Sequence, residues 1–219
     1  DFHSGSHLAT AILAGILGAQ RTGSGCDVDV TLFDTALHQL SYPATWYLNR
    51  NHDMQRLPRG AHPSIAPSQL VKTKDGWGLL MCQTPKFWEL FCDLTGAGQL
   101  KADPRFSANA DRHRNLAELT EIIDRILSER TSAEWVNHFA GEVPFAPVLD
   151  IPGALDNPYL AETEMIETVN HPELEQGLRT LASPFRVNGR RPVSSRGPRL
   201  GEQTDGLSEV RTPSAPVTD

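Results

Sequence analysis

The first seven residues combine a carboxylate with two imidazoles at the start of a helical pattern. Asp1 precedes the pattern, and His3 and His7 fall within its first two turns. The dipole of a helix favours the charged form of a carboxylate near its N-terminus, which keeps the group available as a nucleophile or a ligand. A capping region with surface histidines is the structural alternative. The local pattern leaves both interpretations open.

A metal site is a third interpretation of this segment. His3 and His7 are four residues apart and can share one helix face. However, the glutamate that follows the first histidine in zinc proteases is absent, and no downstream ligands have a matching spacing. We therefore expect no metal site.

A second cluster, Arg-Gly-Ala-His-Pro-Ser, occupies residues 59–64. A flexible Arg-Gly turn before a rigid His-Pro step can present backbone amides and an imidazole to a carboxylate or a thioester. An ordinary linker turn is the alternative. The remaining histidines are interpreted as structural or solvated, and an aromatic set is expected in the core: Trp77, Phe87, Trp88 and Phe91.

The elements around the first cluster follow a helix–turn–strand–helix order. Leu8, Ile12 and Ile16 recur at helical spacing within residues 4–20, and glycines follow at 23 and 25. Residues 26–32 alternate apolar and polar side chains, which predicts a half-buried strand. A second helix is predicted from 34 to 47, with a break at Pro43. This order is typical of a wound α/β layer.

The rest of the chain predicts a smaller mixed unit. Residues 49–68 indicate a long loop or linker, and residues 69–83 a hairpin with a Lys-Asp-Gly turn. Helices are predicted over 85–95, 114–129 and 132–141, the last capped by Thr131 or Ser132. A short strand over 143–149, a short helix over 151–157 and a closing strand over 184–187 follow. Residues 211–219 indicate a disordered tail.

Composition excludes several classes of protein. The 219 residues include 20 basic and 27 acidic side chains, for a net charge of −7, and show no basic stripe, so we expect no nucleic-acid partner. No apolar run approaches the roughly 18 residues of a membrane span. Three unpaired cysteines (Cys26, Cys82, Cys92) indicate buried free thiols in a reducing, cytoplasmic environment. Because the chain starts at Asp1 without methionine, we expect it to be part of a longer protein.

The order of these motifs resembles the class III CoA-transferase family, which includes formyl-CoA transferase, carnitine CoA-transferase and the α-methylacyl-CoA racemases. The resemblance covers roughly residues 1–210. It begins with Asp1, Gly5, a small-residue helix over 8–20, the turn 21–25, the Asp-Val-Asp-Val of 27–30 and the Phe-Asp-Thr-Ala of 33–36. Later motifs lie at residues 74–77, 103–106, 131–135, 143–148 and 198–204.

The resemblance implies an α/β fold with a Rossmann-like large-domain segment and a small α+β domain, the N-terminal half of the family fold being absent. It places the large-domain segment at 1–48, a linker at 49–68, the small domain at 69–187, and the return to the large domain and the tail at 188–219. It also implies an interlocked homodimer.

By the same resemblance, Asp1 matches the nucleophile of the transferases, which attacks an acyl-CoA and carries CoA as a thioester to a carboxylic acid. No cofactor is implied beyond coenzyme A as a substrate moiety. Gly60, Ala61 and His62 lie where the transferases have an active-site loop and are the candidates for substrate binding. The run of consecutive glycines found there in formyl-CoA transferase is absent, which argues against formyl or oxalate specificity.

The racemases of this family give an alternative, because they use the equivalent aspartate as one of two acid/base groups that flank the α-carbon of an acyl-CoA. Their partner histidine precedes the aspartate. His3 and His7 do not match its position.

Overall fold

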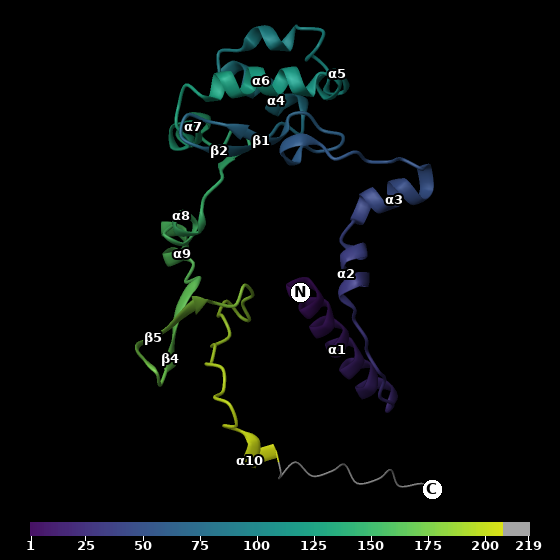
Figure 1. Ribbon diagram of the computed structural model, residues 1–219, viewed down its shortest axis with the longest axis vertical. Coiled ribbons are helices and arrows are strands. Elements are labelled where there is room, and N and C mark those ends of the chain that lie inside the picture. The colour runs from purple at the N-terminus through teal and green to yellow at the C-terminus, as the bar shows by residue number, and fades with distance from the viewer. Residues whose placement is uncertain (208–219) are drawn as a thin grey trace. The chain divides into compact units, whose positions relative to one another are not determined.

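The computed structural model describes residues 1–207 and divides into two units, the first covering residues 1–148 and the second beginning at Leu149 (Figure 1). The helices of the first unit are α1 (Phe2–Thr22), α2 (Leu32–His38), α3 (Ser41–Arg50), α4 (Pro85–Leu94), α5 (Asn109–Arg114), α6 (Leu116–Leu127) and α7 (Ser132–Phe139). Its strands are β1 (Ser68–Lys72), β2 (Trp77–Met81) and β3 (Phe145–Pro147), and two 3₁₀ turns are η1 (Pro58–Gly60) and η2 (Gly98–Lys101). The second unit contains α8 (Ile151–Leu155), α9 (Pro158–Glu162), β4 (Ile166–His171), β5 (Leu174–Leu181) and α10 (Thr204–Leu207).

The predicted first helix is confirmed as α1, a helix of 21 residues. Gly23 ends it in the left-handed region at φ 76°, and its N–H donates to the Ala19 carbonyl at 2.8 Å. None of the residues of α1 is buried, and Leu13 and Leu17 are more than half exposed. The apolar face of the helix is therefore uncovered among residues 1–207.

The predicted strand over 26–32 is wrong. Residues 24–31 are extended, but they pair with no strand among the described residues. Alternating side chains fix which residues share a face, whereas a strand also needs a neighbour for its backbone N–H and C=O groups. The segment instead passes close to α1 at Gly15, where an added Cβ would lie 3.3 Å from Cys26 Sγ. Cys26 is exposed, which also corrects the expected burial of that thiol.

The second predicted helix is divided into α2 and α3. Thr31 begins α2 earlier than predicted, because its Oγ1 accepts a hydrogen bond from the Asp34 N–H at 3.0 Å. The break falls at residues 39–40 and not at Pro43. Pro43 lies in the first turn of α3, where a missing N–H costs no helical hydrogen bond.

The predicted hairpin is confirmed as β1 and β2, and β3 adds to the other edge of β2 in an antiparallel arrangement. Gly78 and Leu80 face the interior, whereas Trp77 is 39% exposed. Trp77 therefore lies outside the core, contrary to expectation. Its ring stacks below two cations instead, with Arg59 Cζ at 5.3 Å and Lys72 Nζ at 5.5 Å from the ring centroid.

The core forms where the predicted helices α4, α6 and α7 meet this sheet, and Figure 1 shows them gathered around the hairpin. Cys82 and Cys92 are buried free thiols, as expected, and desolvation raises the pKa of each to about 12. The largest fully buried side chains include Leu80, Phe91, Phe106, Leu119, Ile123, Leu127 and Phe139. No helix among the described residues is long and apolar enough to cross a bilayer.

The second unit contains a hairpin that the sequence analysis missed, β4 and β5. Gly177 lies in this hairpin at φ 74°, where an added Cβ would come within 2.8 Å of Thr168 Cγ2. The predicted closing strand over 184–187 is wrong, since only an isolated bridge joins Val187 to Arg190. Arg186 and Arg191 hold this segment by donating to the Thr163 carbonyl at 2.8 and 2.9 Å.

The predicted tail over 211–219 lies outside the described residues. The predicted domain limits at 48, 68 and 187 stay predictions.

Gly78→Ala is expected to destabilise the first unit. The added Cβ would meet the Phe145 ring at 2.3 Å, so β3 must move away from β2. We expect a loss of about 1–3 kcal/mol in the free energy of unfolding, measured by urea denaturation. Gly76→Ala is the matched control, because no atom lies within 4 Å of its added Cβ. Equal stability of the two variants would contradict this packing.

Glu134 is expected to make the stability of α7 depend on pH. Its Oε2 accepts hydrogen bonds from the Thr131 N–H at 2.8 Å and the Thr131 hydroxyl at 2.9 Å, and these lower the pKa of Glu134 below its usual 4.5. Since the folded-state pKa is the lower one, the stabilisation is present above pH 4.5 and is lost as the pH falls through the lowered value. Urea denaturation should show that the free energy of unfolding falls less below pH 4.5 in Glu134→Gln than in Glu129→Gln. Glu129→Gln is the control, because the Glu129 carboxylate accepts no hydrogen bond among residues 1–207.

Candidate functional site

Asp1 lies immediately before α1, with its carboxylate unused by the fold. Its backbone carbonyl accepts the first helical hydrogen bond from Gly5 at 2.9 Å, but its side chain does not cap the helix. The residue is exposed. Partial positive charge accumulates at the N-terminus of a helix, so the carboxylate lies where a negative charge is stabilised.

The first turns of α1 also fix His7. The His7 Nδ1 lies 2.9 Å from the His3 carbonyl. Because a carbonyl can only accept a hydrogen bond, Nδ1 carries the proton and donates it. The other ring nitrogen, Nε2, therefore carries the free lone pair in the neutral ring. The ring packs edge-on against His38 of α2, with centroids 5.8 Å apart.

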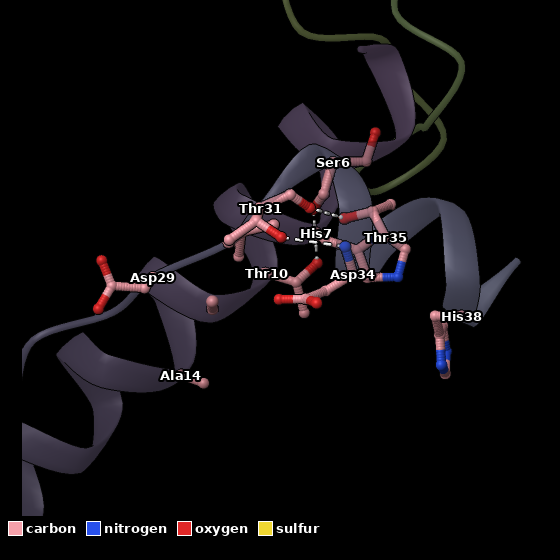
Figure 2. Close-up of a pocket in the computed structure, with 11 residues that line it drawn as sticks. Ser6, His7, Thr10, Ala14, Asp29, Thr31, Asp34, Thr35 and His38 are labelled. Atoms are coloured by element: carbon pink, nitrogen blue, oxygen red, sulfur yellow. Dashed lines mark hydrogen bonds between the residues drawn. The ribbon is translucent and has the colours of Figure 1, made fainter.

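A cavity of about 560 Å³ lies beside these residues (Figure 2). Its walls are the second and third turns of α1, the end of the extended segment and α2. It is lined by Ser6, His7, Thr10, Ala11, Ala14, Asp29, Val30, Thr31, Asp34, Thr35 and His38. Asp1 is not among them. The cavity therefore starts about one turn along α1 from the candidate nucleophile.

Most polar groups of this cavity are bonded locally. The hydroxyls of Ser6, Thr10 and Thr35 donate to the carbonyls of Phe2, Ser6 and Thr31 at 2.8–3.0 Å. His7 and His38 have the ring nitrogens that remain for a ligand. Among residues 1–207, no group of three or more histidine, cysteine or acidic side chains could hold a metal ion.

The second candidate segment, residues 60–62, follows a strained turn. Arg59 and Gly60 both take left-handed backbone angles, at φ 57° and 62°. For Arg59 this conformation carries a steric cost that a non-glycine residue accepts only under tertiary restraint. The restraint is visible, because the Arg59 guanidinium forms a 2.8 Å ion pair with Asp124 of α6.

His62 is held in one tautomer by two neighbours. The Ser64 backbone N–H donates to Nδ1 at 3.1 Å, so this nitrogen carries no proton. The proton of the neutral ring then lies on Nε2, which is 3.2 Å from Tyr42 Oη. The backbone N–H groups of Ala61 and His62 are also occupied, donating to the carbonyls of Pro58 and Ser68 at 3.1 and 2.9 Å.

The described residues show no hydrogen bond or ring contact that joins Asp1 to residues 60–62. His62 was identified from the sequence, but Tyr42 was not. Tyr42 is part of no sequence motif, and its contact with His62 joins residues that are 20 positions apart. His38, interpreted from the sequence as structural or solvated, lines the cavity beside His7.

A model of one protein family, CoA-transferase family III, matches residues 1–204. The chain belongs to CoA-transferase family III. Its relatives include the acetyl-CoA:oxalate CoA-transferase of Acetobacter aceti, 28% identical over 220 residues that cover 98% of this chain and 54% of that protein. The succinyl-CoA:glutarate CoA-transferase of Mus musculus is 27% identical over 209 residues, covering 93% of this chain and 47% of that protein.

Solved structures confirm the family III fold. A CAIB/BAIF family protein from Brucella suis superposes with a TM-score of 0.76 at 27% identity, over 94% of this chain and 53% of the other. The Rv3272 protein of Mycobacterium tuberculosis, in an orthorhombic crystal form, gives a TM-score of 0.76 at 27% identity, over 92% and 52%. The chain spans about half the length of the curated relatives it matches.

Tyr42→Phe tests the tautomer of His62. The substitution removes the acceptor at Nε2 and leaves the Ser64 bond to Nδ1 intact. We expect ¹⁵N-detected imidazole spectra to show protonated Nε2 in both proteins, with faster Nε2–H exchange in the variant. Tyr47→Phe is the control, because the Tyr47 hydroxyl makes no hydrogen bond among residues 1–207. A protonated Nδ1 in the neutral ring would contradict the geometry.

Proposed function

We propose that the protein carrying this chain transfers CoA from an acyl-CoA to a carboxylic acid, with Asp1 as the covalent nucleophile. The observation that carries the proposal is the match to CoA-transferase family III from residue 1 to 204. The exposed, unbonded carboxylate at the N-terminus of α1 supplies the group that the chemistry needs.

The proposed reaction balances without ATP or redox chemistry. A carboxylate oxygen of Asp1 attacks the thioester carbonyl, the C–S bond breaks, and CoA leaves as a thiolate from a mixed anhydride. The thiolate attacks the Asp1 carbonyl carbon, which releases the first acid as a carboxylate and leaves an aspartyl–CoA thioester. An acceptor carboxylate then repeats the two steps in reverse, which restores Asp1. Coenzyme A takes part only as a substrate moiety.

Asp1 suits both halves of this cycle electrostatically. As a nucleophile it must be ionised, which the N-terminus of α1 favours.

Each attack also develops an oxyanion, which needs hydrogen-bond donors close by. In the described conformation the N–H groups of Ala61 and His62 already have acceptors. Binding of substrate through the N–H groups of Ala61 and His62 therefore requires this loop to change conformation.

The relatives support a carboxylic acid as the acceptor. Their names specify oxalate, glutarate and mesaconate, all of them carboxylic acids, and acetyl-CoA or succinyl-CoA as the donors. We extend only the shared chemistry to this protein, an acyl-CoA donor and a carboxylate acceptor. The homodimer implied by the family resemblance and the cytoplasmic location indicated by the unpaired cysteines are part of the same proposal.

Asp1→Asn in the protein at its full natural length is expected to lower the rate of CoA transfer by at least about 10³-fold, because an amide cannot form the anhydride. Intact-mass spectra with an acyl-CoA should show a CoA adduct on the wild-type protein that hydroxylamine removes, and none on the variant. Asp27→Asn is the matched control, an exposed acid outside the cavity. Wild-type activity in Asp1→Asn would exclude the covalent mechanism.

A second assay distinguishes the racemase alternative. An enzyme that uses Asp1 as an acid/base group incorporates deuterium at the α-carbon of an acyl-CoA in D₂O, with no acceptor acid present. We expect no such exchange. Exchange that depends on Asp1, without a CoA adduct, would replace the transferase proposal with the racemase one.

A further inference from the structure

Arg112 of α5 is a buried cation whose hydrogen bonding is incomplete. It is 3% exposed. A guanidinium has five N–H donors. Nε donates to the Ala66 carbonyl at 2.6 Å, and Nη1 donates to the carbonyls of Phe106 and Ser107 at 2.9 and 3.0 Å. The two N–H groups of Nη2 make no hydrogen bond with the described residues.

The charge of Arg112 is also not in direct contact with a carboxylate of the described residues. Arg112 takes part in none of the salt bridges among residues 1–207. Its three acceptors are neutral carbonyls, and its Cζ lies 4.8 Å from the centroid of the Trp88 ring. Desolvation is the main effect on the group and lowers the pKa of the guanidinium. A buried charge is normally paired, so an unpaired one indicates a place for an anion.

A cavity of about 370 Å³ adjoins this side chain. It is lined by Gln83, Thr84, Pro85, Trp88, Glu89, Lys101, Ser107, Ala108, Asn109 and Arg112. The lining includes the N-terminal end of the 10-residue helix α4, whose dipole favours negative charge. It also includes Trp88, whose indole Nε1–H is buried and has no acceptor among the described residues.

The acidic groups near the cavity leave Arg112 unpaired. Lys101, the second cation of the lining, already forms a salt bridge with Asp93. Glu89 is the acidic residue of the lining, but it is exposed and forms no salt bridge among residues 1–207. The guanidinium therefore borders a cavity with room for a small anion, and no residue among 1–207 forms a salt bridge with it.

We propose that this cavity binds a small oxyanion, a carboxylate or phosphate group, whose oxygen accepts hydrogen bonds from Arg112 Nη2. The site lies in the part of the first unit around the β1–β2 hairpin, residues 68–147, and Asp1 is not in its lining. It is thus a second ligand site, and its existence does not depend on the covalent chemistry of Asp1.

Removing Arg112 is a poor test, because the side chain also holds three backbone carbonyls. Gln83→Glu is sharper. Gln83 is an exposed residue of the lining, and the change keeps its size while adding a carboxylate to the cavity. If the cavity is built for an oxyanion, this carboxylate occupies the site and competes with added ligand. Gln99→Glu is the matched control, an exposed glutamine outside the lining.

The measurement is a calorimetric and thermal-unfolding titration of the full-length protein with potassium acetate and with potassium phosphate, against potassium chloride at equal ionic strength. We expect saturable binding and a raised Tm with at least one oxyanion, in wild type and in Gln99→Glu. Binding should be at least about tenfold weaker in Gln83→Glu. The response to acetate or to phosphate tells a carboxylate site from a phosphate site.

Two results would overturn the proposal. One is a response to both oxyanions that equals the response to chloride. The other is oxyanion binding that Gln83→Glu leaves unchanged. The titration is repeated with Asp1→Asn, in which binding at Arg112 should persist. A loss of CoA transfer in that variant then bears on the proposed function alone.

Discussion

The position of the Asp1 carboxylate depends on α1, and α1 depends on few contacts within the chain. Its side chains are open to solvent or half-buried. It is held by the close approach of Gly15 to the extended segment and by the packing of His7 against His38. A long helix gives a carboxylate a well-defined electrostatic environment, but helix formation alone stabilises such an element weakly in water. The proposed nucleophile therefore precedes a helix that few contacts hold in place.

The part of the first unit around the β1–β2 hairpin, residues 68–147, is in contrast well packed. Its core joins the sheet to α4, α6 and α7. Polar contacts also connect this core to the loop at residues 58–62. Asp124 of α6 is central to this arrangement, because it pairs with Arg59 and also accepts a hydrogen bond from the Lys72 N–H at 2.9 Å. The turn before His62 is thereby tied to a helix that packs against the core. Tyr42 then links His62 to α3.

Local patterns predicted the elements that local chemistry determines. The spacing of leucines and isoleucines located α1 and α6, and the Lys-Asp-Gly turn located the hairpin; α4 and α7 were also predicted as helices. Thr131 was one of the two residues expected to cap α7, and the structure shows it as the cap, in a capping box with Glu134. The strand over 26–32 failed because pairing needs a neighbour that a local pattern does not reveal. Tyr42, His38 and the environment of Arg112 were missed for the same reason, since each depends on residues far away in the chain.

The residue that reacts with the acyl-CoA can be identified directly. Wild-type protein at its full natural length, mixed with an acyl-CoA in the absence of acceptor, should be quenched with hydroxylamine and digested with trypsin. We expect a hydroxamate on Asp1, in the peptide that ends at Arg21. A modification on another residue, or turnover that leaves this peptide unmodified at every quench time, would contradict it.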